Sequence, residues 1–282
     1  MIKIRGMRNA LLAIILLCIT VLNVAAKNNG ISLKKTKVLV YTKNGVGFVH
    51  DNIASAVACI QKLGQEEGFK VDVTDKASVF TEENLKQYTM LIFPSTNNDV
   101  FDTDTQRLAF RRYIEAGGGF VGIHSVTGTE RKWTWFKQML GCTFAMHDFY
   151  QKFSVKVIAP NHPSVQGLPK VWIREDECYF GKELHPGIIV VMAHDLKTLD
   201  GGKNNIYASA AGPFNLLYPA VWYQNFDGGN IWITTLGHSK ESYSEPIFVK
   251  HILNGIKFVA SQAKKLDFTK AYALTRDDEV RY

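Results

Sequence analysis

The stretch Gly117-Gly-Gly-Phe-Val-Gly-Ile-His-Ser125 decides the fold of this chain. Its glycines end a predicted helix, residues 120–123 form an apolar run typical of a buried parallel strand, and His124-Ser125 begins a sharp turn. A strand that turns abruptly into a helix exposes the residue at the turn, and the backbone amides beside it can bind an anion. The stretch therefore predicts both an α/β fold and a ligand site.

The same alternation of apolar strands and helices covers residues 37–260 without a repeat or a dividing linker. Strands are predicted at 37–41, 69–74, 90–93, 120–123, 153–158, 188–192, 220–223 and 230–235, and helices at 52–67, 81–84, 102–115, 133–140 and 246–260. Asp227-Gly-Gly229 is expected to form a tight hairpin turn. The pattern predicts an α/β fold with a mostly parallel central sheet flanked by helices on both faces.

The first 26 residues are typical of an export signal. A basic stretch ending at Arg8 precedes an apolar run over 10–22, and Val24-Ala25-Ala26 offers compact residues at the cleavage positions. We therefore expect a signal peptide at 1–26, a linker at 27–36, and an exported, periplasmic or extracellular protein with no stable membrane span after cleavage. An uncleaved anchor is the alternative, because a spanning helix needs only about 17 to 25 apolar residues.

Charge and motifs exclude two classes of function. Lys3, Arg5 and Arg8 carry three of the formal +7 charges, and the remaining +4 is too mild and scattered to indicate a nucleic-acid partner. No Gly-x-Gly-x-x-Gly follows a predicted strand and no Gly-Lys-Ser/Thr occurs, so the sequence does not support a nucleotide cofactor.

Histidines follow the predicted strands at the edge of the sheet where ligands gather. His50 follows the first strand, His124 the fourth and His238 the last, while His147 lies in a loop after the helix at 133–140. Ligands of parallel α/β sheets bind at the carboxyl ends of the strands. We therefore expect a pocket there, with His124 at its centre and Ser125 beside it.

Several short motifs, in this order, resemble the ThuA-like, or trehalose-utilisation, family. They are Phe48-Val-His-Asp51, Val121-Gly-Ile-His-Ser125, Asn161-His-Pro163, Asp176-Glu177 and Leu236-Gly-His-Ser-Lys-Glu-Ser-Tyr243. The resemblance implies a class I glutamine amidotransferase-like, flavodoxin-like three-layer sandwich over 37–260 and a role in carbohydrate metabolism. Residues 261–282 are expected to form a C-terminal tail. His124 stands where amidotransferases have Cys, so we do not expect a glutamine amidotransferase.

Two chemistries remain open for the pocket. In the first, His238 is polarised by Glu241 and faces His124 across a sugar, with Glu177 as a base or hydroxyl ligand. In the second, His124, His147 and His238 hold a divalent metal such as zinc, and Glu177 completes the set of ligands.

Other residues are expected to bind the ligand itself. His50, Ser125 and Asp176 are the polar candidates, and Trp133 or Tyr150 would stack on a sugar ring. Trp133 and Trp135 are two positions apart and cannot share one helix face, so one of them is expected to face a cleft.

These observations favour an exported carbohydrate-processing enzyme. It would be a hydrolase, lyase or isomerase acting on a sugar or oxidised glycoside, with a small carbohydrate as its ligand. The alternative is a non-catalytic sugar-binding module, consistent with Tyr218-Pro219 standing where a His-Pro pair is common in the family. The sequence leaves the oligomeric state open.

Overall fold

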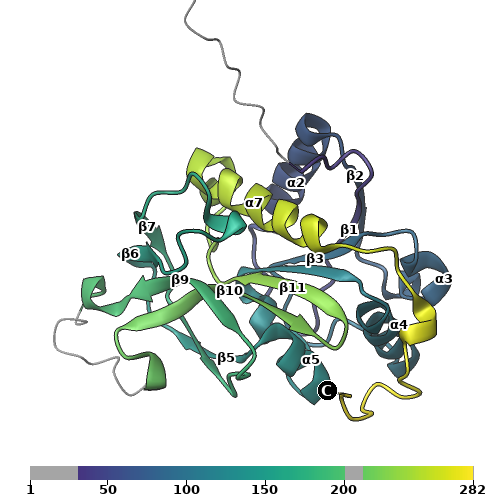
Figure 1. Ribbon diagram of the computed structural model, residues 1–282. Helices are drawn as coiled ribbons and strands as arrows, with labels where there is room; N and C mark the ends of the chain where they lie inside the picture. Colours follow the sequence, from purple (N-terminus) through teal and green to yellow (C-terminus); the bar gives the residue numbers. More distant parts are fainter. Residues whose placement is uncertain (1–30, 201–211, 282) are drawn as a thin grey trace, which may run out of the picture. The chain divides into compact units, whose positions relative to one another are not determined.

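A computed structural model of the chain describes residues 31–200 and 212–281. The predicted signal peptide at 1–26, and residues 27–30 of the predicted linker, lie outside these residues. The described residues form a nine-stranded sheet with helices on both faces (Figure 1) and a separate two-stranded sheet. In order across the large sheet the strands are β2 (Lys70–Thr74), β1 (Lys37–Tyr41), β3 (Met90–Pro94), β4 (Gly119–Ile123), β11 (Gly229–Thr234), β10 (Leu217–Phe226), β9 (Ile189–Asp195), β6 (Gln151–Val157) and β7 (Val171–Asp176).

The sheet has a parallel part and an antiparallel extension. From β2 to β11 every neighbouring pair is parallel, in the order of a flavodoxin-like fold, and from β11 to β7 every pair is antiparallel. This confirms the α/β prediction with its parallel central strands. The sequence did not predict β7, because it is an edge strand whose residues alternate between exposed and buried rather than forming an apolar run.

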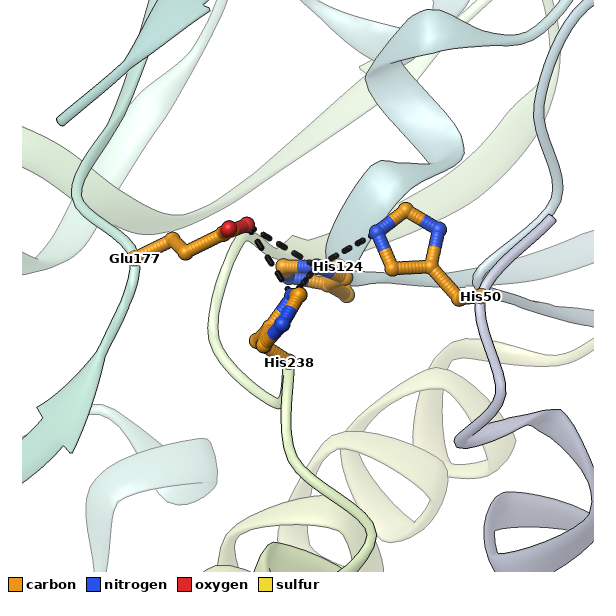
Figure 2. A group of neighbouring side chains, drawn as sticks. All are labelled: His50, His124, Glu177 and His238. Atoms are coloured by element: carbon orange, nitrogen blue, oxygen red, sulfur yellow. Dashed lines mark hydrogen bonds and ion pairs between the residues drawn. The ribbon is translucent and has the colours of Figure 1, made fainter. Parts of the chain in front are cut away.

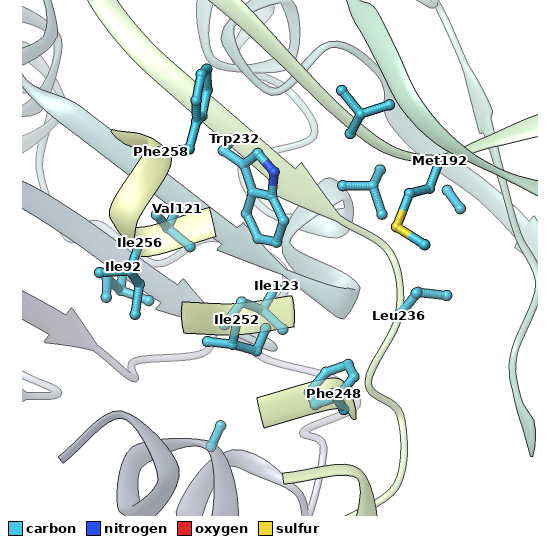
Figure 3. Packing of buried hydrophobic residues seen from close by; sticks show 14 of the residues in the cluster. Ile92, Val121, Ile123, Met192, Trp232, Leu236, Phe248, Ile252, Ile256 and Phe258 are labelled. Atoms are coloured by element: carbon cyan, nitrogen blue, oxygen red, sulfur yellow. The ribbon is translucent and has the colours of Figure 1, made fainter. Parts of the chain in front are cut away.

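Helices pack on both faces of the parallel strands. On one face lie α2 (Ile53–Glu67) and α7 (Pro246–Gln262), and on the other lie α3 (Glu82–Leu85), α4 (Asp104–Glu115) and α5 (Thr134–Leu140). Val38 and Val40 pack toward the first face, whereas Leu39 and Tyr41 pack toward the second. Figure 3 shows the first of these cores, where side chains of α7 such as Ile252 meet Ile123 and other strand residues. Because both faces are buried, the inner strands β1, β3 and β4 are largely apolar, whereas the edge strand β2 alternates between charged or polar residues and valines.

The predicted hairpin turn is confirmed between β10 and β11. Phe226 pairs with Gly229, and both intervening residues have positive φ, 48° at Asp227 and 92° at Gly228. Two consecutive positive φ values define the turn that matches the twist of antiparallel strands, and Asp-Gly is its favoured sequence.

The C-terminal tail is bound to α4. The guanidinium of Arg111 is fully buried and donates hydrogen bonds to the carbonyls of Arg276 and Asp278. The carboxylate of Glu115 accepts from the backbone amides of Tyr272 and its neighbour at 2.9 and 3.1 Å. The tail thus supplies partners for a buried cation and a buried anion of this helix.

Two further features of the described residues concern membrane spans and cysteines. Among residues 31–200 and 212–281, no helix is both long and apolar enough to cross a bilayer. The cysteines of the same residues are buried free thiols at Cys59, Cys142 and Cys178.

Candidate functional site

His124 directly follows β4 at the carboxyl edge of the sheet. Its φ is 54°, a left-handed conformation that a non-glycine residue adopts at some cost and that is common at functional sites. Its Nδ1 lies 3.0 Å from the carbonyl oxygen of Thr235, which can only accept a hydrogen bond. The Nδ1 of His124 therefore carries the proton, and the lone pair of Nε2 points into the site.

His50 lies opposite His124, in the loop between β1 and α2, and its tautomer follows from the same kind of argument. Ser125 Oγ donates its one proton to the carbonyl of Thr96 at 3.1 Å, so it accepts from His50 Nδ1, also at 3.1 Å. The Nε2 lone pair of His50 then faces that of His124 across 3.1 Å. Two facing lone pairs repel each other unless a cation lies between them.

His238 and Glu177 close the site from the other side. His238 lies in the loop after β11, and Glu177 follows β7, which ends at the same edge of the sheet. The carboxylate of Asp176 accepts from the backbone amides of Gly237 and His238 at 2.8 and 3.1 Å, and it pairs with Arg174 at 2.8 Å. This fully buried carboxylate therefore ties the end of the antiparallel extension to the loop that carries His238.

The four side chains converge on one point (Figure 2). His124 Nε2 lies 3.1 Å from His50 Nε2, 3.3 Å from His238 Nδ1 and 3.7 Å from Glu177 Oε2, and His238 Nδ1 lies 3.0 Å from Glu177 Oε2. All four atoms lie within 4.8 Å of one another. Zinc bonds of about 2.0 to 2.1 Å place the ligand atoms of a tetrahedral site roughly 3.3 Å apart. The spacing therefore fits a divalent metal bound to three imidazoles and a carboxylate.

The electrostatics of the cluster follow from burial and from the charge of Glu177. Burial lowers the pKa of His50 to about 4, and burial together with His50 lowers the pKa of His124 well below its usual value. The contact with Glu177 raises the pKa of His238. Burial opposes the ionisation of Glu177, but the contact with His238 lowers its pKa on balance. Neutral imidazoles beside an ionised carboxylate are the forms that bind metals.

A cavity of about 360 Å³ opens onto three of these four side chains. Besides His50, Glu177 and His238 it is lined by the side chains or backbone of Phe48, Asn97, Ser125, Gly128, Arg131, Phe144, His147 and Tyr179. Its volume is in the range of small-molecule sites, and aromatic rings form part of its wall. The Tyr179 hydroxyl also reaches the cluster, 3.1 Å from His124 Nε2.

The structure brings some of the predicted ligand and catalytic residues to the four-residue cluster or to its surroundings. His124, His238, Glu177, His50 and Ser125 meet as described. His147 lies at the edge of the group on β5 (Thr143–His147), where its Nδ1 donates to the carbonyl of Asp148 at 2.8 Å and lies 3.5 Å from Glu177. Tyr150 is exposed, with its ring 5.6 Å from that of His238.

Other predicted residues lie elsewhere. Trp133 and Trp135 are both buried, their rings 5.2 Å apart, and neither lines the cavity. Trp133 precedes α5 rather than lying within it, so the argument from helix faces did not apply. Asp176 is buried in its ion pair and faces backbone amides, and Glu241 is exposed. The carboxylate that contacts His238 is Glu177.

Sequence reasoning missed Phe48, Phe144, Arg131 and Tyr179. Phe144 and Tyr179 lie on the two-stranded antiparallel sheet formed by β5 and β8 (Tyr179–Lys182), which was not predicted because these short strands carry no long apolar run. Tyr179 follows Glu177 by two positions, and Arg131 follows the turn at His124 by seven. Proximity to the predicted site along the chain was the only available signal.

Comparison with known proteins places this fold and motif order in a family. The family model described as trehalose utilisation matches residues 37–259. The chain belongs to the ThuA family. A search of curated proteins gives no match.

Solved structures of ThuA-like proteins share the fold. One from Bacteroides uniformis is 24% identical, with a TM-score of 0.67 over 83% of this chain and 95% of that one. A second from Parabacteroides merdae is 19% identical, with a TM-score of 0.65 over 83% and 93% of the chains. A β-galactosidase from Rahnella is 16% identical, with a TM-score of 0.51 over 78% of this chain and 30% of that one. The ThuA-like neighbours share the glutamine amidotransferase-like fold.

Proposed function

We propose that this ThuA-family chain is an enzyme acting on a sugar or oxidised glycoside with the help of a divalent metal. The observation that carries the proposal is the facing pair of imidazole lone pairs at His50 and His124, 3.1 Å apart. The carboxylate of Glu177 adds to it, because its Oε2 is directed at the same point, 3.0 Å from His238 Nδ1 and 3.7 Å from His124 Nε2. Both features are accounted for by a cation at the centre of the cluster.

A bound divalent ion would polarise a sugar carbonyl or hydroxyl, or lower the pKa of a bound water. The chain's own residues supply the rest of the site. Thr235 and Ser125 orient the two buried imidazoles through their Nδ1 protons. His147 is exposed on the cavity wall near Glu177, where it can carry a proton to or from the substrate. Hydrolysis, elimination and isomerisation can each use this combination.

The test is the metal content of protein purified without chelators or a histidine tag. We expect about one equivalent of zinc, manganese or a similar ion, lost in His124→Ala and Glu177→Gln. His185→Ala is the matched control, since His185 lies outside the cluster and bonds Gln224. Absence of metal, or full retention in His124→Ala, would overturn the metal-assisted site and leave acid–base catalysis by His124 and His238.

Turnover separates the enzyme from a sugar-binding module that keeps the fold. The Tyr218 hydroxyl bonds the backbone of Gly181 and makes no contact with the four-residue cluster. Tyr218 thus leaves the four-residue cluster intact, and we expect the metal-loaded protein to consume at least one sugar of a panel of disaccharides and keto-sugars. Binding without consumption would favour the module.

We also propose that the chain is exported, on the strength of its N-terminal segment. The mature protein is expected to begin near residue 27. N-terminal sequencing of protein recovered from the periplasm or medium would establish this, whereas an intact segment at the membrane would favour an anchor.

A further inference from the structure

Arg131 is a cation held in place on the wall of the cavity. Its Nε donates to the carbonyl of Gly128 at 2.9 Å, and its Nη2 donates to Asn97 Oδ1 at 3.1 Å. The guanidinium lies over the ring of Phe144, 5.4 Å from its centroid. Neither hydrogen-bond acceptor carries a charge. The side chain is thus positioned by its neighbours without being neutralised by them.

The backbone around Arg131 is anchored as well. The adjacent Glu130 is buried, accepts from the backbone amides of Val100 and Phe101 at 2.9 and 3.1 Å, and pairs with Arg107 at 2.8 Å. Gly128 allows the close approach on the other side, because a Cβ at this position would lie 2.5 Å from Asn97 Oδ1 and 2.9 Å from Arg131 Nη2. Much of the conformational entropy of an arginine side chain is therefore lost before any ligand arrives.

No carboxylate balances this charge. Among the described residues, Arg131 forms no ion pair, and its Nη1 makes no hydrogen bond. Of the residues that line the cavity, it alone carries a permanent positive charge, and Glu177, the one carboxylate of the wall, contacts the histidines instead. A neutral hydroxyl could be bound by any of several uncharged donors nearby. A preorganised guanidinium with free N–H groups is suited to an oxyanion, and above all to a planar carboxylate.

We propose that Arg131 binds the carboxylate of the substrate, so that the substrate class is a sugar acid such as a uronate or aldonate. This rests on the proposed function for the sugar part of the ligand. The acid group would lie at the Arg131 end of the cavity, with the polyol directed to the four-residue cluster. Phe48 and Phe144 also line the cavity, and aromatic rings suit the apolar face of a sugar.

The experiment measures binding of D-glucuronate, D-galacturonate and D-gluconate to the metal-loaded protein by calorimetry, with D-glucose and D-galactose as neutral counterparts. At least one acid is expected to bind about tenfold or more tightly than its neutral counterpart, the lower end of what a hydrogen bond to a charged group contributes. Arg131→Gln should abolish this preference, and Arg131→Lys, which keeps the charge without the fork, should retain part of it. Lys132→Gln is the matched control, because Lys132 is an exposed cation that does not line the cavity.

Metal content, measured on the same samples, separates this inference from the proposed function. Metal that stays at about one equivalent in Arg131→Gln, together with a lost acid preference, supports both. Equal binding of acids and neutral sugars, no binding of either, or a preference that survives Arg131→Gln overturns the inference even when the metal site is intact. An acid preference that depends on Arg131 in a protein without metal supports the inference and overturns the metal site.

Discussion

Asp176→Asn tests whether one buried carboxylate holds the site together. Asp176 is fully buried and accepts from the backbone amides of Glu177, Gly237 and His238 at 2.9, 2.8 and 3.1 Å, while pairing with Arg174 at 2.8 Å. Asparagine has nearly the same shape, but one of its terminal atoms is a donor and it has no charge. The variant therefore leaves a buried guanidinium without its counter-ion and at least one amide without an acceptor.

The expected loss follows from the burial of this ion pair. Removing one partner of a buried pair costs about 3 to 5 kcal/mol in the free energy of unfolding. Arg174 keeps a hydrogen bond to Ser242 at 2.9 Å and lies 3.8 Å from Glu245, so the lower end of that range is expected. For a domain of about 250 residues, 1 kcal/mol shifts the melting temperature by about 2 to 4 °C, which gives a fall of about 6 to 12 °C.

The metal affinity of the site should fall together with the free energy of unfolding. Glu177 and the loop carrying His238 are both tied to Asp176, so a metal ion should bind about 10-fold to 100-fold more weakly to Asp176→Asn. Thermal unfolding of the metal-free protein measures the first effect, and calorimetric titration with zinc measures the second. Asp72→Asn is the control, because the Asp72 pair with Lys37 is half exposed and should change the unfolding free energy by less than about 1 kcal/mol.

A double variant separates stability from positioning. Arg174→Met combined with Asp176→Asn removes the unpaired cation, so much of the stability should return, because replacing a buried pair with apolar side chains is often nearly neutral. The metal affinity should stay low, because the loop with His238 still lacks its acceptor. A melting temperature within about 3 °C of wild type for Asp176→Asn, or full metal affinity in either variant, would refute this reasoning.

Three further predictions follow from the same contacts. His50→Ala should lose the metal and His147→Ala should keep it, because His50 belongs to the four converging side chains and His147 does not. Elemental analysis measures both, and the reverse result would support the ligand set expected from sequence, in which His147 binds the metal. Burial lowers the pKa of His251 to about 3, so unfolding takes up a proton below pH 6.5 and the free energy of unfolding falls by up to about 1.4 kcal/mol per pH unit between pH 6 and pH 4. In urea denaturation, the unfolding free energy of wild type should therefore approach that of His251→Leu as the pH falls from 6 to 4. A difference between the two proteins that stays constant over that range would contradict the prediction. Truncation after residue 266 should lower the unfolding free energy by at least about 3 kcal/mol in the same assay, because buried Arg111 loses its carbonyl partners in the tail. Removal of residue 282 alone is the control. An unchanged urea midpoint in the truncated protein would contradict a stabilising role of the tail.

The parallel half of the sheet could be predicted from sequence because burial on both faces leaves a local record. Strands such as 37–41 and 90–94 are continuous apolar runs, and the glycines at 117–119 end a helix before the next strand. The antiparallel extension leaves a weaker record, since an edge strand such as β7 is buried on one face only and mixes charged with apolar residues. The β5–β8 sheet is missing from the prediction because its strands are short and carry no long apolar run.

The sequence by itself determined that histidines stand at the carboxyl ends of the parallel strands, because the ends of strands and the turns after them follow from local patterns. It also singled out His124, His238 and Glu177 as candidate site residues. Only the tertiary structure decided that His50 rather than His147 joins them, that Glu177 rather than Glu241 contacts His238, and that Arg131 shares their cavity. These pairings depend on where the antiparallel strands return to the sheet edge and on which oxygen accepts from the Nδ1 of His124 and of His50. Such contacts join residues up to 114 positions apart, and no local pattern records them.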